Sequence, residues 1–146
     1  MEKENLIFQA KNNYLKEGFS CGEALVKAIK DAELFEVSDE VLKITSCFKT
    51  GIGMKKNFCG ALLAGIVLIG LKYGRIKKEE SPQRALEITA QLYEEFEEEF
   101  GSVKCGELLK EFIEKDALES QERKEFCANN FISFVVKKLE EILKEK

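Results

Sequence analysis

The chain has 146 residues, which is enough to bury a sizeable core, and it is most simply one domain over residues 1–146. Its composition, 45% hydrophobic and 34% charged with a single proline, is typical of a soluble helical protein. A net charge of −4 without a basic stripe argues against nucleic-acid binding, and the lack of histidine excludes catalytic triads and histidine-ligated haem within this chain.

The first half of the chain predicts three helices and a loop. Apolar spacing predicts a helix over about residues 4–17, ended by Gly18, and a second from Ser20 to about residue 32. Ser20 and Glu23 form a capping box there. Ser38 begins a third helix that ends near residue 48. Residues 49–56 contain two glycines and few apolar side chains, so we expect a loop. A phosphate-binding role for this loop is the weaker alternative, because no Gly-Lys-Ser/Thr signature is present.

The centre of the chain is its most apolar part. Residues 58–71 contain no charged or strongly polar side chain, yet 14 residues are too few for a bilayer, which needs about 20. We therefore predict a buried central helix over about residues 58–74, capped by Asn57, with the other helices around it. Gly65 and Gly70 within it are expected to permit close helix packing.

The second half predicts three more helices, which makes an all-α bundle of about seven. Ser81 and Pro82 begin a helix that ends at Gly101, and its glutamates are expected to form a solvated face. A di-metal carboxylate site is the weaker alternative, because the usual Glu-x-x-His partners are missing. Ser102 is expected to cap the next helix, and the last helix runs from about residue 126 towards the C-terminus.

The cysteines have a shared local pattern. Three of the five are followed directly by glycine at an expected helix start: Cys21-Gly22, Cys59-Gly60 and Cys105-Gly106. A helix start carries unpaired N–H groups and partial positive charge, so a thiolate there should have a lowered pKa. Because glycine costs a helix up to about 1 kcal/mol, its presence predicts that a metal cluster or a neighbouring chain approaches the backbone. The alternative for any single cysteine is packing alone.

The chain resembles a family of redox-active proteins of about this length, which carry four widely spaced cysteines and a Cys-Gly-Ala-x-x-Gly motif. The resemblance rests on residues 59–63, Cys-Gly-Ala-Leu-Leu, on residues 51–54 and 100–105, and on Cys21 and Cys127. A related helical domain in split-Soret cytochrome c carries an iron–sulfur cluster. Two features depart from the pattern. Ala64 occupies the position of the final glycine of the motif, and Gly65 follows it. Cys47 lies outside the four-cysteine set.

The resemblance implies a set of site residues. Its four family cysteines map to Cys21, Cys59, Cys105 and Cys127, which would be the metal ligands. The amides of Gly22, Gly60 and Gly106, at the helix starts, are expected to offset the negative charge of the bound group.

The leading hypothesis is an all-α redox or electron-transfer protein that binds one iron–sulfur cluster, 2Fe-2S or 4Fe-4S. The alternatives are a cofactor-free thiol–disulfide protein and a structural four-cysteine zinc protein. The N-terminus lacks the apolar core of a signal peptide, which predicts the reducing cytoplasm. The expected partner is an unidentified redox protein. We expect no membrane insertion of this chain, and a narrow apolar seam on its helices is compatible with a homodimer.

Overall fold

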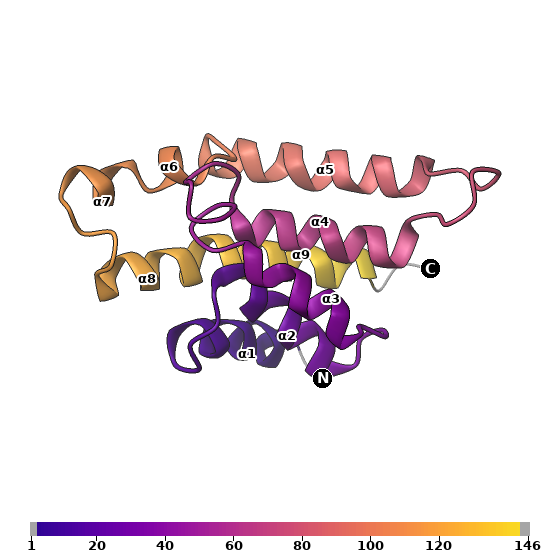
Figure 1. Ribbon diagram of the computed structural model, residues 1–146, viewed down its shortest axis with the longest axis horizontal. Coiled ribbons are helices and arrows are strands. Elements are labelled where there is room, and N and C mark those ends of the chain that lie inside the picture. Colours follow the sequence, from indigo (N-terminus) through magenta and orange to yellow (C-terminus); the bar gives the residue numbers. More distant parts are fainter. Residues whose placement is uncertain (1–2, 144–146) are drawn as a thin grey trace.

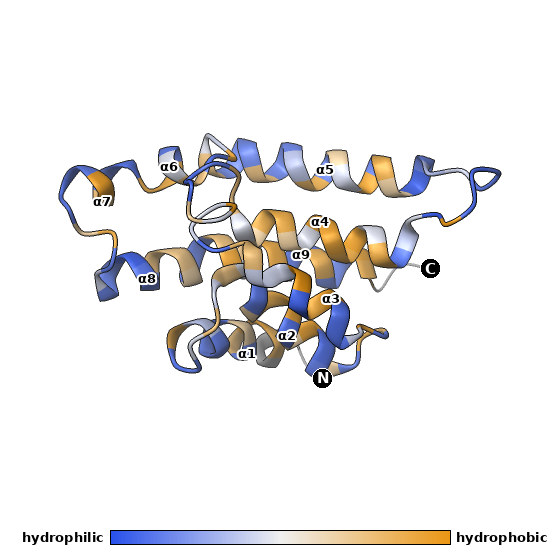
Figure 2. Ribbon diagram, in the orientation of Figure 1, coloured by the Kyte–Doolittle hydropathy of each residue, from blue (hydrophilic) through white to orange (hydrophobic). Residues whose placement is uncertain are grey.

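The apolar run after Cys59 forms α4 (Gly60–Tyr73), which lies at the centre of the bundle. The computed structural model describes residues 3–143. Figure 2 shows α4 in mostly hydrophobic colours, and it contacts α2 (Cys21–Ala32), α5 (Gln83–Phe100) and α9 (Ser133–Leu143). The side chains of Leu62, Leu68 and Ile69 are fully buried. The prediction of a buried central helix is therefore confirmed, although the helix begins two residues later than expected.

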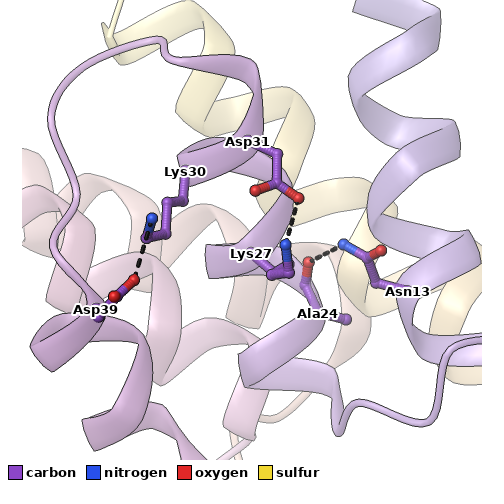
Figure 3. A network of polar contacts seen from close by, with 6 residues as sticks. All are labelled: Asn13, Ala24, Lys27, Lys30, Asp31 and Asp39. Carbon is purple, nitrogen blue, oxygen red and sulfur yellow. Dashed lines mark hydrogen bonds and ion pairs between the residues drawn. The ribbon is translucent and has the colours of Figure 1, made fainter.

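The N-terminal third forms one side of the bundle. It contains α1 (Lys3–Leu15), α2, α3 (Asp39–Ile44) and the 3₁₀ turn η1 (Thr45–Cys47). Figure 3 shows the polar contacts there: the Asn13 amide donates to the Ala24 carbonyl at 3.2 Å, so α1 is tied to α2. Lys30 pairs with Asp39 at 3.2 Å, which ties α2 to α3. The helices predicted for this third are confirmed.

The C-terminal half is more broken than the sequence predicts. After α5 the chain forms α6 (Cys105–Leu108), α7 (Lys110–Glu114) and α8 (Gln121–Cys127), then the π-helical segment η2 (Ala128–Ile132) and α9. Figure 1 shows α6, α7 and α8 as an extension beyond the cysteine end of α4. The fold class is all-α, as predicted: within residues 3–143 no strand forms, and a single β-bridge joins Phe58 to Lys104.

Several helix starts differ from the predicted caps. Ser38 caps α3 and Ser20 forms the predicted box with Glu23, whose carboxylate accepts from the Ser20 amide at 2.9 Å. The N-cap of α4, however, is Cys59, because Asn57 uses its side-chain oxygen to accept from the Ile52 amide at 2.6 Å. The N-caps of α5 and α6 are Pro82 and Lys104 rather than Ser81 and Ser102, since each serine hydroxyl accepts from an amide two residues later.

The two glycines inside α4 behave differently. A methyl group at Gly65 would lie 2.7 Å from Val135 Cγ1, so the predicted close helix packing is confirmed there. At Gly70 nothing lies within 4 Å of such a methyl, so that part of the prediction is wrong. Glu97, Glu98 and Glu99 on α5 are exposed, which confirms the solvated acidic face. Within residues 3–143, the helices are all too short or too polar to cross a bilayer.

Candidate functional site

A cavity of about 300 Å³ lies where α2, α4, α6 and α8 meet. Four of the five cysteines line it: Cys21, Cys59, Cys105 and Cys127. Cys21 begins α2, Cys59 directly precedes α4, Cys105 begins α6 and Cys127 ends α8. The fold therefore brings to one place the four thiols that the sequence singled out, although they are spread over more than 100 residues of chain.

The bridge between Phe58 and Lys104 positions Cys59 and Cys105. The Cys59 amide donates to the Val103 carbonyl at 2.8 Å, and the Cys105 amide donates to the carbonyl of residue 57 at 2.5 Å. In an antiparallel pair of this register, Cys59 and Cys105 are diagonal neighbours on the same face. This short ladder fixes the two sulfur atoms relative to each other before either helix begins.

Cys21 is positioned by the packing of α2 against the start of α4. Its thiol donates to the Phe48 carbonyl, with Sγ and O 3.8 Å apart. A methyl group added to Gly60 would lie 3.0 Å from Cys21 Sγ and 2.3 Å from the Phe48 carbonyl oxygen. A methyl added to Gly22 would lie 3.1 Å from the Gly60 carbonyl oxygen. Glycine is required at position 60, because the backbones touch there, and a side chain at position 22 would be tightly packed.

The close neighbour that the Cys-Gly pattern predicts is thus the protein's own chain at all three sites. A methyl at Gly106 would lie 3.1 Å from the Lys56 carbonyl oxygen, and the Gly106 amide donates to that same oxygen at 2.9 Å. The sequence analysis expected the Gly106 amide to face the bound group. In the structure this amide is already hydrogen-bonded within the chain. The Gly22 amide hydrogen-bonds the Cys21 sulfur. At Cys59 the amides that bond the sulfur belong to Ala61 and Leu62.

Cys127 lies at the junction of α8 with η2 and has polar partners of its own. Arg123, one turn earlier on α8, donates from Nη1 to Cys127 Sγ at 3.6 Å and also to the Tyr14 hydroxyl. Its Nε donates to the Leu118 carbonyl. A π-helical turn often marks a functional position, because the extra residue per turn shifts the direction of the following side chains.

Arg123 is a buried cation without a carboxylate partner. It is 8% exposed, and no carboxylate oxygen of the side chains of residues 6–143 lies within ion-pair distance of it. A buried charge normally needs a counter-charge. The hydrogen-bond partners of Arg123 that can become anionic are the Cys127 thiol and, less readily, the Tyr14 hydroxyl. Burial raises the pKa of the Cys127 thiol, while the hydrogen bond and the charge of Arg123 act in the opposite direction and favour the thiolate.

The prediction that the helix starts lower the thiol pKa values is wrong for the metal-free protein. Burial raises the pKa of Cys59 to about 12, although the Leu62 and Ala61 amides act in the opposite direction. Burial and the nearby Cys127 raise the pKa of Cys105 to about 11. The pKa of Cys21 lies well above its ordinary value because of burial and then because of the other three thiols. Desolvation outweighs the helix-end field here.

The fifth cysteine does not belong to this group. Cys47 is exposed at the end of η1, and its thiol does not line the cavity. Packing in the core was the alternative given for any single cysteine, and the exposure of Cys47 excludes that role for it.

Sequence reasoning missed Arg123 and Tyr14. The spacing of Arg123 to Cys127, four residues on one helix, places both on the same face and could have identified the arginine. Tyr14 lies 109 residues from Arg123, so no local pattern points to it.

Comparisons with known proteins identify one family. The family model described as "Putative redox-active protein (C_GCAxxG_C_C)" matches residues 19–142. Its description writes the motif in the order Gly-Cys-Ala, whereas this chain has Cys59, Gly60 and Ala61. No curated protein and no solved structure matches the chain.

Proposed function

The chain belongs to this redox-active protein family, and we propose that it transfers electrons by means of one iron–sulfur cluster bound through Cys21, Cys59, Cys105 and Cys127. Family membership supports the redox role. The observation that carries the cluster proposal is the convergence of these four thiols on one cavity, beside a buried guanidinium. Iron–sulfur clusters are held by cysteine thiolates, and a cluster with four thiolates is net negative, which such a cation offsets.

The size of the cavity favours a polynuclear group over a single ion. A cavity of about 10–15 Å³ is enough to hold one water molecule, whereas this cavity measures about 300 Å³. A single zinc ion would need its sulfur ligands within about 2.3 Å of one point. Among the residues that the structure describes, no group of three or more histidine, cysteine, aspartate or glutamate side chains is placed to hold a metal ion. Four thiols around a larger space suit a cluster better than they suit zinc.

The residues around the cavity have separate tasks in this proposal. The amides of Ala61 and Leu62 hydrogen-bond the Cys59 sulfur, and Arg123 does the same for Cys127. Hydrogen bonds to ligand sulfur stabilise the more negative state and so raise the reduction potential. Leu109 and Phe131 line the cavity and exclude water from part of its wall. The cluster, when bound, supplies a centre that accepts and releases one electron.

A thiol–disulfide function is the second candidate. All four thiols are free in the structure, and they share the cavity. The charges of the other three, when ionised, raise the pKa of Cys21, which places them close to it. Two of them could cycle between dithiol and disulfide without any metal. This candidate needs no metal, but it leaves the buried Arg123 cation and two of the four cysteines without a role.

Anaerobic purification followed by absorption and EPR spectroscopy tests the proposal. We expect a brown protein with iron and inorganic sulfide in stoichiometric amounts and an EPR signal in one oxidation state. A colourless protein that stays iron-free after anaerobic reconstitution with iron and sulfide would overturn the cluster. A reversible mass change of two hydrogens between reduced and oxidised protein would then support the thiol–disulfide function.

A further inference from the structure

A loop of residues 48–57, which we call the cover loop, forms part of the wall of the four-cysteine cavity. Its residues Lys49, Thr50 and Gly51 line the cavity. Its other end holds the α6 segment, because the carbonyls of Lys56 and Asn57 accept from the amides of residues 106 and 105. Figure 1 shows the cover loop in purple, near α6 and the start of α4. A partner that approaches the site from this side meets the cover loop first.

Internal hydrogen bonds give the cover loop a defined shape. The Met54 amide donates to the Lys49 carbonyl at 2.8 Å, and the Lys56 amide donates to the Thr50 carbonyl at 2.9 Å. Thr50, Met54 and Lys56 adopt positive φ angles, which are uncommon for residues with side chains. These bonds hold the backbone positions from which the outward side chains of the loop extend.

The charge of this surface is opposite in sign to that of the whole protein. Lys49, Lys55 and Lys56 of the cover loop are exposed, as is Lys104, which the bridge to Phe58 places beside them. Among the side chains of residues 6–143, no carboxylate lies within ion-pair distance of these four lysines. Residues 41–78 contain no aspartate or glutamate, although the protein carries a net charge of −4. The cover loop is thus a local basic patch with unpaired charges.

The centre of the patch is apolar. Ile52 and Met54, between the lysines in sequence, have exposed fractions of 40% and 52%. Protein–protein interfaces combine an apolar centre, in which methionine is enriched, with a polar rim. A single loop buries little area, which matches the small interfaces of transient redox complexes, below about 1,200 Å².

We propose that the cover loop, together with Lys104, is the docking surface for an acidic redox protein that exchanges one electron with the four-cysteine site. This inference rests on the proposed function. In each exchange one partner loses an electron and the other gains it, and no covalent bond forms or breaks. The unpaired lysines attract an acidic surface and speed the encounter, and the apolar centre is covered in the complex.

An acidic protein accounts for the surface better than an anionic membrane does. Stable attraction to anionic lipid usually needs a cluster of 4–8 basic residues that is not opposed by the rest of the molecule. Here the net charge is −4, and Glu97, Glu98 and Glu99 of α5 add an exposed acidic run. A docking protein also needs to reach the redox site, and the cover loop lies directly against the cavity.

Electron transfer to a small anionic oxidant tests the charge of this surface at the site itself. The reduced protein is mixed with hexacyanoferrate(III), which gains one electron and becomes hexacyanoferrate(II), and the rate is followed by stopped flow. The test variant is Lys49→Glu with Lys55→Glu. The matched control is Lys77→Glu with Lys78→Glu, in the loop at the other end of α4, which changes the net charge equally. The midpoint potential of each variant is measured so that rates are compared at equal driving force.

We expect the cover-loop variant to react about tenfold more slowly at low ionic strength, with the difference vanishing at about 0.5 M salt. The control should stay within about twofold of the unmodified protein. Equal rates for the two variants would overturn the proposal.

A second measurement does not depend on a bound cluster. A glutamate 20-mer is titrated into the ¹⁵N-labelled full chain, and amide shifts are recorded by NMR. Shifts concentrated on residues 49–56 and 104, and lost in the cover-loop variant, support the docking surface. Shifts elsewhere, stronger binding to phosphatidylserine vesicles than to the peptide, or self-association through the same residues would overturn it. If no redox centre is found, the proposed function fails, and this titration still decides whether the surface binds acidic chains.

Discussion

The two ends of α4 carry glycines in opposite surroundings. At the first end, a methyl group on Gly60 would lie 2.3 Å from the Phe48 carbonyl oxygen. Ten residues later, a methyl on Gly70 would meet nothing within 4 Å. The first end also holds the four thiols and a buried arginine, whereas the second leads into a loop whose Ile76 is 98% exposed. One helix thus joins a crowded end to an open one.

The contrast shows where the fold contains energetically unfavourable features. Buried thiols, an unpaired buried cation and a backbone contact that allows no side chain are each costly on general grounds. All of them occur at the Gly60 end, and together they assemble one cavity. The Gly70 end has no buried thiol and no buried arginine, and its one tight backbone contact, of Gly74 with the Gly70 carbonyl, lies within a single helix turn. Costs that gather at one place indicate that the place has a function, and the predictions below compare the two ends directly.

The largest effect should come from the thiols. Serine in place of Cys21, Cys59, Cys105 or Cys127 keeps the size of the side chain but removes a soft ligand. Each change is expected to reduce the iron content of anaerobically prepared protein to background. Serine at the exposed Cys47 should leave the iron content unchanged. Full iron and an unaltered spectrum after replacement of any one of the four would remove that residue from the ligand set.

Replacement of Arg123 should have the next largest effect, and it should depend on the cluster. Arg123→Gln leaves the anionic site without its cation, so we expect the iron-loaded protein to lose about 3 kcal/mol of unfolding free energy. The metal-free protein should lose clearly less, since its thiols are neutral.

Arg75→Gln is the control for Arg123→Gln at the other end of α4. Arg75 donates to the carbonyls of residues 78 and 80 on the surface, at 3.0 and 2.9 Å. Its replacement should cost less than about 1 kcal/mol, with and without iron. Denaturant unfolding of both variants under argon provides the comparison. An Arg123→Gln cost that is the same with and without iron would show that the arginine serves packing only.

A glycine pair tests the backbone contact. Gly60→Ala forces the Phe48 carbonyl away and should destabilise the protein by about 2 kcal/mol, the usual scale of overpacking. Gly70→Ala fills open space in the same helix and should stabilise it by up to about 1 kcal/mol. Thermal unfolding of both variants measures the two signs. If both changes have the same sign, the contrast between the ends of α4 is not what the geometry indicates.

The smallest effect concerns pH. Burial raises the pKa of Cys59 to about 12 from its usual value of 9.0, so the folded metal-free protein holds this proton more tightly than the unfolded chain does. The resulting stability is fully present below about pH 9 and is lost as the pH rises towards 12. Between pH 9 and 10 the loss should approach about 1 kcal/mol. Cys59→Ala should show a shallower dependence over the same range, and an equal slope would contradict the raised pKa.

Local patterns were sufficient to predict much of the fold. The uncharged run of residues 58–71 predicts α4, and the Ser20–Glu23 box and Gly101 correctly mark the start of α2 and the end of α5. Each of these signals acts within a few residues, so a single sequence contains it.

The differences arise where distant segments meet. Asn57 does not cap α4 because its side chain bonds the cover loop, and Ser102 does not cap α6 because the bridge from Phe58 to Lys104 extends the chain there. The four thiols were identified from their glycines and from the family resemblance, and the cavity that they share was not visible in the sequence. The contact of Arg123 with Tyr14 depends on how α8 packs near α1.

The central claim is that the four thiols hold an iron–sulfur cluster, and native mass spectrometry of the anaerobically prepared full chain tests it most directly. The account predicts a mass above that of the bare chain by whole numbers of iron and sulfide, less the four thiol protons. It also predicts that this mass species disappears in Cys59→Ser and persists in Cys47→Ser. A chain that carries one zinc ion, or that is lighter by two hydrogens and free of metal after reconstitution, would contradict it.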